Sequence, residues 1–390
     1  MKPTYSVSEV RTIMLEYAAM TGLSPLGTTP RRYLWTDAFA LCNMLELFRQ
    51  TNDGEWRDLA LRLVHQVHHI LGRHRSDDPR SGWISGLAEA AGELHPTQGG
   101  LRIGKQLNER GPGEPADERL EWDRDGQYYH YLTKWMHALN RVSRVTGDPL
   151  YAGWAVELAK RALDAFACAP SHGGQKRMYW KMSIDLTRPL VPSMGQHDPL
   201  DGYVTCSELQ ASAGGLGLQP RLDLQAEITE LAAICQGRDW GTYDPLGLGG
   251  LLSDAWRIAQ LTDTGVFRDT SLLEAVVDAA LEGVAGFAGS TSLKQRAAFR
   301  LAFRELGLSI GLHGALLLRE WSQQHPERLP AGSPLVRKIE ALAGYLPLAG
   351  EIEDFWLAQD NRGADTWREH KEINMVMLAT SLAPDAFLAI

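Results

Sequence analysis

Apolar positions recur along this chain every three to four residues, which is the spacing of one face of an α-helix. We find no run with the strict apolar–polar alternation of a half-buried strand. The pattern gives twelve helical segments, at about 6–20, 36–50, 54–72, 124–145, 149–168, 200–213, 221–236, 246–261, 267–286, 294–322, 334–346 and 366–382. The sequence therefore predicts an all-α protein.

A polar turn recurs three times between two helical segments. Residues 51–53, 146–148 and 262–264 read Thr-Asn-Asp, Thr-Gly-Asp and Thr-Asp-Thr. Asp and Thr accept hydrogen bonds from the first N–H groups of a helix, and Gly147 suits the left-handed residue that follows a helix end. Each copy predicts a tight αα-hairpin in which the second helix starts at once.

The connections between segments alternate in length, and the long ones are about 73–123 and 169–199. Twelve helices joined in this way are typical of an (α/α)6 barrel, a toroid of about twelve alternating inner and outer helices. The even-numbered segments form the inner ring, and the long loops gather above their N-termini, as functional loops do. We see no linker, so residues 1–390 are predicted to form one domain.

Four or five of the six predicted inner helices begin with an aromatic residue or His close to a carboxylate. If the helices form a ring, these side chains converge on one cavity. Aromatic faces cover the apolar C–H patches of a sugar, while carboxylates bind hydroxyls and do acid–base work at an acetal. The residues predicted to bind substrate are Trp35, Gln127, Tyr128, His197, Tyr243, Asp244, Arg304, Trp367 and Glu369.

Helix capping is an alternative role for every Asp at these positions, because Asp is a favoured N-cap. Asp37 and Asp125 are the best exceptions, since Thr36 and Asp123 beside them could cap instead. Asp125 also lies among aromatic residues, which would lower the local polarity, as suits a general acid. We therefore predict Asp125 as one catalytic carboxylate, with a partner from the set Asp37, Asp198 and Asp201.

Composition and sequence motifs limit which partners, cofactors and location are expected for the protein. The formal net charge of -9 argues against nucleic acid, because phosphate binding needs a basic face. Neither a signal-peptide pattern nor a membrane-spanning run is seen, and the four scattered cysteines are typical of reduced core thiols, so a cytoplasmic location is expected. No metal or cofactor is required, and no Gly-rich phosphate loop is seen. Oligomeric state is left open.

The whole chain resembles the six-hairpin glycosidase superfamily, whose relatives include the N-acylglucosamine 2-epimerase and unsaturated glucuronyl hydrolase families. The resemblance rests on the twelve-helix pattern, the Thr-Gly-Asp-x-x-Tyr turn at 146–151 and the Trp-x-Asp helix starts. It implies an (α/α)6 barrel with a sugar cleft at the inner-helix N-termini. The epimerases are similar in placing a catalytic His near the start of the last inner helix, which His370 could match, but their second His is missing from 244–261.

Three functions follow for a small saccharide or oligosaccharide partner. The leading one is a glycoside hydrolase that uses paired carboxylates. The second is a sugar 2-epimerase or isomerase with His370 as the acid–base group. The third is a barrel that binds carbohydrate without turnover. An anionic substrate is a further alternative, because Arg102, Lys105 and Arg110 lie in one long loop; solvated charge is the other explanation for them.

Overall fold

A computed structural model describes residues 7–27, 29–170, 173–215, 222–267 and 269–390. The chain divides into two compact units, and each is described by itself. The central unit spans Ala18–Gln236, and the terminal unit combines Met1–Tyr17 with Gly237–Ile390. Whether the chain is one domain stays a prediction. The first residue of two predicted segments, 6–20 and 221–236, lies outside the described residues.

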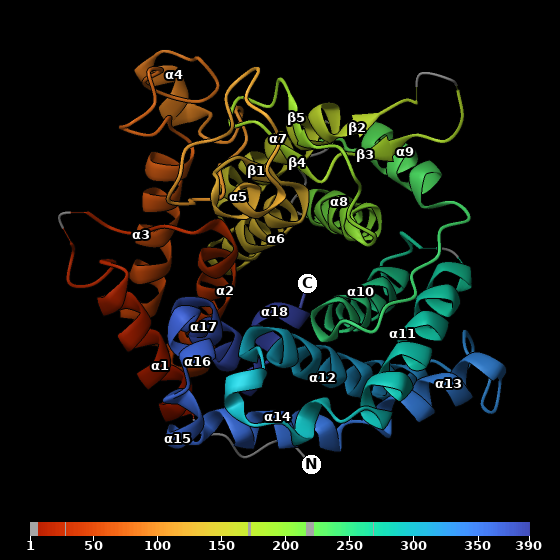
Figure 1. Cartoon of the computed structure of the whole chain (residues 1–390). Coiled ribbons are helices and arrows are strands. Elements are labelled where there is room, and N and C mark those ends of the chain that lie inside the picture. Colours follow the sequence, from red (N-terminus) through yellow and green to blue (C-terminus); the bar gives the residue numbers. More distant parts are fainter. Residues whose placement is uncertain (1–6, 28, 171–172, 216–221, 268) are drawn as a thin grey trace. The chain divides into compact units, whose positions relative to one another are not determined.

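The central unit consists of helix pairs with long loops (Figure 1). Helix α6 packs between α2 and α8, and α3, α7 and α9 cover these three from outside. Its helices are α2 (Leu34–Thr51), α3 (Gly54–Leu71), α4 (Glu89–Leu94), α5 (Glu118–Asp123), α6 (Tyr129–Thr146), α7 (Pro149–Phe166), α8 (Asp198–Gly215) and α9 (Gln225–Cys235). Six match predicted segments, while the short α4 and α5 lie inside the long loop 73–123 and were not predicted.

Local capping explains two of the predicted hairpin turns. Asn52 takes the left-handed conformation after α2, and the Asp53 side chain accepts from the N–H of Glu55 at the start of α3. Gly147 has a φ of 74° after α6, and Asp148 accepts from the N–H of Leu150. The prediction of tight turns at these two places is confirmed.

The third turn differs from the prediction. Helix α10 (Pro245–Asp263) ends there, but α11 (Ser271–Gly289) begins seven residues after Thr264. At the start of α11, the Asp269 side chain accepts a hydrogen bond from the backbone N–H of Ser271. The carboxylate of Asp263 instead accepts from the indole N–H of Trp321 on another helix. A tertiary contact has therefore replaced the predicted cap.

Two small antiparallel sheets interrupt the helices of the central unit. One has the order β1–β4–β5, and the other pairs β2 with β3. The strands are β1 (Gln127–Tyr128), β2 (Ala167–Cys168), β3 (Arg177–Met178), β4 (Lys181–Met182) and β5 (Pro189–Val191). None was predicted, because two or three residues cannot display a period of two. The pairing of β1 with β4 ties the second long loop to the chain just before α6.

The terminal unit is also helical. Helix α12 packs against α10, α14 and α17, while α11 covers α10. Its remaining elements are α1 (Val7–Met20, which runs into the central unit), the 3-10 turns η1 (Ser292–Lys294) and η2 (Ala297–Phe299), α12 (Ala302–Gln324), α13 (Pro334–Ala343), α14 (Pro347–Leu357), α15 (Gln359–Arg362), α16 (Asp365–Glu369), α17 (Lys371–Leu382) and α18 (Asp385–Leu388). The predicted segment 294–322 thus begins with two 3-10 turns, and 366–382 breaks at His370.

The described helices include none that is both long and apolar enough to cross a membrane. The four cysteines form no disulfide; Cys42, Cys206 and Cys235 are buried, and Cys168 in β2 is half-buried. A cytoplasmic location stays a prediction.

Candidate functional site

The start of α6 is shaped by the small sheet. Strand β1 pairs with β4 so that Tyr128 lies opposite Lys181, which places the preceding residue, Trp180, beside Tyr128. Gly126 makes the bend before β1: its φ is 149°, and a Cβ atom there would lie 2.7 Å from the carbonyl oxygen of Met182. A side chain at this position would push the loop away from α6. The two long loops are thereby joined at one helix start.

Aromatic rings form a connected cluster at the starts of α2 and α6. The centroid of Tyr128 lies 5.3 Å from that of Trp180 and 5.4 Å from that of His130, on which it stacks. Trp35, in the first turn of α2, lies 6.0 Å from His130 and 5.3 Å from Tyr131. Such a group of ring faces and edges is suited to the apolar patches of a sugar.

His130 and Asp198 add acid–base groups to this cluster. His130 Nδ1 lies 3.5 Å from Asp198 Oδ1, with the His side chain 25% exposed and the Asp side chain 8%. Three buried polar atoms here have no hydrogen-bond partner among the described residues: His130 Nδ1, Asp198 Oδ2 and Trp35 Nε1. Because a buried polar group without a partner costs about 1–3 kcal/mol, an external hydroxyl would stabilise this arrangement.

Two further tyrosines, Tyr33 and Tyr131, belong to the aromatic cluster. The hydroxyls of Tyr33 and Tyr131 lie 2.6 Å apart. Burial raises the pKa of Tyr131 well above its ordinary value, and Tyr33 raises it further. Burial likewise raises the pKa of Tyr128. Tyr128 and Tyr131 therefore stay protonated near neutral pH and can donate hydrogen bonds, but they do not act as bases.

The predicted carboxylate Asp37 lies in the first turn of α2 and is fully buried. One oxygen accepts from the backbone N–H of Tyr33 at 2.9 Å, and the other from Arg32 at 3.1 Å. Arg32 also donates to the carbonyl of Thr21. These contacts tie the start of α2 together, which is a structural role. Catalysis by Asp37 stays a prediction.

Asp125, the leading predicted acid, is also fully buried. Its Oδ2 accepts from Arg102 at 2.8 Å, and its Oδ1 accepts from the N–H groups of Gly104 and Gly126. These contacts occupy both carboxylate oxygens and fix the long loop against α6. Its catalytic role stays an untested prediction.

The other predicted residues of the central unit differ in their contacts. Asp201 accepts from Lys134 at 2.7 Å and from the Thr133 hydroxyl. The buried amide of Gln127 forms hydrogen bonds with the backbone of Gly99, Leu101 and Ile184, so it braces the loops. His197 is half-buried directly before α8. Substrate contact by these residues stays a prediction.

In the terminal unit, the start of α10 is polar and open. Asp244 caps α10 by accepting from Leu246, and it accepts from Arg304 at 2.6 Å, with both side chains about 40% exposed. The Tyr243 hydroxyl reaches Glu282 on α11, an outer-layer contact. These contacts neither support nor contradict a substrate role.

Three predicted residues, Trp367, Glu369 and His370, lie at the break between α16 and α17, and they differ in burial. Trp367 is buried and stacks on Trp356 at 5.6 Å. Glu369 and His370 are exposed, and the His370 ring meets the edge of Phe303 at 5.5 Å. Trp367 therefore packs in the core, while His370 remains available for acid–base chemistry.

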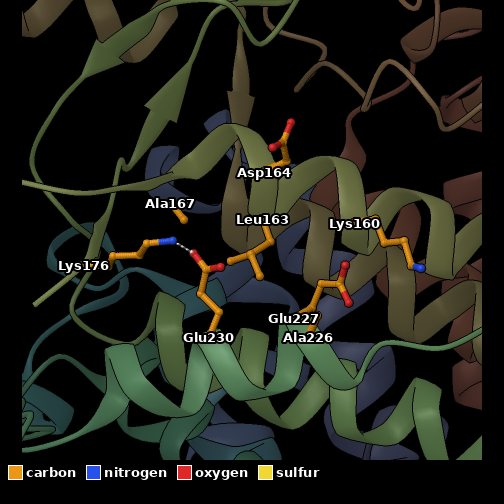
Figure 2. Close-up of a pocket in the computed structure, with 8 residues that line it drawn as sticks. All are labelled: Lys160, Leu163, Asp164, Ala167, Lys176, Ala226, Glu227 and Glu230. Atoms are coloured by element: carbon orange, nitrogen blue, oxygen red, sulfur yellow. Dashed lines mark hydrogen bonds and ion pairs between the residues drawn. The ribbon is translucent and has the colours of Figure 1, made fainter.

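A surface hollow of about 220 Å³ lies between the outer helices α7 and α9. Figure 2 shows Lys176 reaching across to Glu230, an ion pair of 2.8 Å. The lining residues are Lys160, Leu163, Asp164, Ala167, Lys176, Ala226, Glu227 and Glu230. None of these described lining residues is aromatic, so they lack the groups that favour a sugar ring, and we do not assign the site to this hollow.

Two members of the aromatic cluster, Trp35 and Tyr128, were predicted from the sequence, whereas Tyr33, His130, Tyr131 and Trp180 were missed. The signal for Trp180 is the pair Tyr179-Trp180 inside the long loop 169–199. For His130 the signal is its position two residues after Tyr128, at the start of an inner helix.

No family model matches this chain, and no curated protein matches it either. Several solved structures do. The GH76 alpha-mannanase of Bacteroides thetaiotaomicron is 8% identical, covers 97% of this chain and 95% of its own, and has a TM-score of 0.50. A D-mannose isomerase is 12% identical over 97% and 99% of the two chains, with a TM-score of 0.49. The cellobiose 2-epimerase of Spirochaeta thermophila is 12% identical over 90% and 100%, with a TM-score of 0.42.

The likeness to the mannanase shows the fold. It is an all-α (α/α)6 fold, as the helical pattern predicted. At 8% identity the likeness extends to the fold alone.

Proposed function

We propose that this chain is a carbohydrate-active enzyme whose site lies at the starts of α2, α6 and α8. The observation that carries the proposal is the aromatic cluster around Trp35, Tyr128 and Trp180. It surrounds two buried polar atoms that have no partner among the described residues, Asp198 Oδ2 and Trp35 Nε1. Apolar faces beside unsatisfied donors and acceptors match the alternating C–H and hydroxyl surface of a sugar. That a mannanase shares the fold supports the same substrate class.

Within this class, we propose proton transfer on a free sugar, the chemistry of an epimerase or isomerase. His130 is the acid–base group, because histidine is the side chain that most often transfers protons in catalysis, and Asp198 orients it. His130 takes the proton from C2 of the open-chain sugar while the electron pair passes to the C1 carbonyl oxygen. Protonation of C2 from solvent on the other face, as His130 gives its proton to solvent, yields the epimer. Return of the His130 proton to C1, as the O2 proton passes to O1, yields the ketose.

Asp198 is a positioning residue in this scheme. Its Oδ1 lies 3.5 Å from His130 Nδ1, longer than a normal hydrogen bond. Such contacts often shorten when substrate binds. The geometry therefore allows Asp198 to hold a proton on Nδ1 and leave Nε2 for the sugar.

Proton NMR in D₂O tests the proposal directly. Mannose, glucose and their disaccharides are incubated with the protein, and loss of the C2 proton signal is followed together with the appearance of new sugars. We expect C2 exchange that His130→Gln abolishes and that His95→Gln, an exposed control paired with Glu157, leaves intact. Solvent exchange that is equally fast in His130→Gln would overturn the assignment.

Glycoside hydrolysis is the second candidate, favoured by the first turn of α8. Asp198 and Asp201 are both there, one helical turn apart, and Asp198 Oδ2 has no partner among the described residues. Asp198 would protonate the leaving oxygen, and Asp201, paired with Lys134, would act on the anomeric carbon or on water. Release of reducing sugar from oligosaccharides without C2 exchange selects this candidate. Binding without either reaction marks a non-catalytic barrel.

A further inference from the structure

Helix α5 carries a large apolar side chain on its outer surface. Trp122 is 53% exposed. A single exposed apolar residue is ordinary in a folded protein, so exposure by itself indicates nothing. Trp122, however, lies edge-on to Trp180, with ring centroids 5.0 Å apart and an interplanar angle of 74°. It therefore continues the aromatic cluster of the candidate site outward to the surface.

The chain of rings has a definite direction. Trp180 is stacked on the plane of His130, with centroids 6.4 Å apart, and Trp122 lies one ring further out. Each step is comparable to the length of one pyranose residue. Among the described residues, the indole N–H groups of Trp122 and Trp180 have no hydrogen-bond acceptor, which leaves them able to donate to sugar hydroxyls.

The backbone around Trp122 is held in place from both sides. The buried ammonium of Lys181 donates to the carbonyl of Glu121 at 2.6 Å and to that of Arg124 at 2.9 Å. The Glu121 side chain accepts from Arg110 at 2.6 Å, and Asp117 caps the start of α5. An exposed ring on a fixed backbone is preorganised, so binding a ligand there costs little ordering entropy.

We propose that Trp122 and Trp180 form an outer sugar-binding subsite, so that the substrate is a disaccharide or longer. The reacting sugar lies against His130, Tyr128 and Trp35, and the next pyranose ring stacks on Trp122. This inference rests on the proposed function and adds the length of the substrate to it.

The experiment compares sugars of increasing length: glucose and mannose, then their β-1,4 and α-1,6 disaccharides, then α-1,6-mannotetraose. The ratio of kcat/KM for disaccharide over monosaccharide is measured for wild type, Trp122→Ala, Trp122→Phe and Leu150→Ala. Leu150 is 45% exposed at the start of α7 and serves as a surface control. Circular dichroism and thermal unfolding check that each variant is folded.

We expect wild type and Leu150→Ala to prefer the disaccharide. Trp122→Ala should lower that preference about tenfold, the size of one ring-stacking contact, through KM more than kcat, and Trp122→Phe should keep part of it. An unchanged preference in a folded Trp122→Ala, or no preference in wild type, would overturn the subsite.

Calorimetric titration with the same sugars separates failure of the subsite from failure of the proposed function. If no variant turns over any sugar, yet mannotetraose binds more tightly than mannose and Trp122→Ala removes that difference, the subsite stands and the catalytic proposal fails. If His130-dependent turnover occurs but Trp122→Ala has no effect on sugar binding or preference, the catalytic proposal stands and the subsite fails. Absence of binding by any of the sugars would overturn both.

Discussion

The helix starts of the two units are built from similar residue types and differ in how those residues are used. In the central unit, Asp37 and Asp125 are buried and each accepts from an arginine. In the terminal unit, Asp244 and Arg304 form a pair that is about 40% exposed. The long loops of the central unit account for the contrast, because they cover its helix starts and supply Arg102 and Trp180. Burial therefore decides whether an Asp near a helix start is structural or accessible.

The largest effect that tests this contrast is on turnover. We expect His130→Gln to lower turnover by roughly a hundredfold or more, as loss of an acid–base group does. Stability should change little, since His130 Nδ1 has no hydrogen-bond partner among the described residues. The measurement is the rate of C2 proton exchange per folded molecule. The matched variant in the terminal unit is His370→Gln; if it alone removes activity, the terminal unit carries the acid–base group.

Stability should separate the buried and exposed carboxylates. Asp125→Ala leaves Arg102 without its carboxylate in the interior, which should lower the free energy of unfolding by about 3–5 kcal/mol. Asp244→Ala removes an exposed pair and a cap, so about 1 kcal/mol is expected. Urea unfolding monitored by circular dichroism measures both. Equal losses would show that burial does not distinguish the two helix starts.

Acid should destabilise the protein through His68, in the outer layer of the central unit. His68 Nε2 accepts from the indole N–H of Trp135 at 3.2 Å, and burial lowers the pKa of His68 from 6.5 to about 3. The unfolded state therefore binds the proton more readily between these values. This contribution to stability is complete above pH 6.5 and is lost as pH falls, by about 1.4 kcal/mol per pH unit.

The control for this effect is His68→Gln, which cannot titrate. Urea unfolding at pH 7.0, 6.0 and 5.0 should give a shallower pH dependence for the variant than for wild type. His95→Gln, whose side chain is 54% exposed, should keep the wild-type slope. Parallel slopes for wild type and His68→Gln would contradict the assignment of the buried, neutral imidazole.

The smallest expected effect concerns the hairpin turns. Asp148→Ala removes the acceptor for the Leu150 N–H and should cost about 1 kcal/mol, whereas Asp148→Asn keeps a good cap and should cost a few tenths. The midpoint of thermal unfolding is sensitive enough to separate the two. If Asn is as harmful as Ala, the carboxylate has a role beyond capping.

Much of the fold could be predicted because its signals are local. The αL residue after a helix and the Asp that caps the next one lie side by side in sequence at 52–53 and 147–148. The turn at 262–264 was predicted wrongly because the partner of Asp263 is Trp321, 58 residues away. Helix α14 was missed, since it follows α13 after a short turn and begins with Pro347. A long-range contact therefore limits the prediction of the third turn, whereas a short connection conceals α14.

The candidate site depends even more on contacts between residues that are distant in sequence, which local patterns do not predict. Trp35, Tyr128 and Asp198 could be named because they lie at helix starts. His130 and Trp180 could not, since their roles depend on a pairing of two-residue strands. Nor could the sequence indicate that Arg32 and Arg102 would occupy the carboxylates of Asp37 and Asp125.

The pairing of β2 with β3 gives the chain a natural attachment point for a probe. Cys168 lies in β2 opposite Arg177, three residues before Trp180, and it is the half-buried thiol among four cysteines of which the others are buried. A maleimide dye should react there first, without any engineered cysteine. The emission of the attached dye would then report movements of the β2–β3 hairpin when sugar is added. The native sequence thus already provides the labelling site for a fluorescent binding sensor.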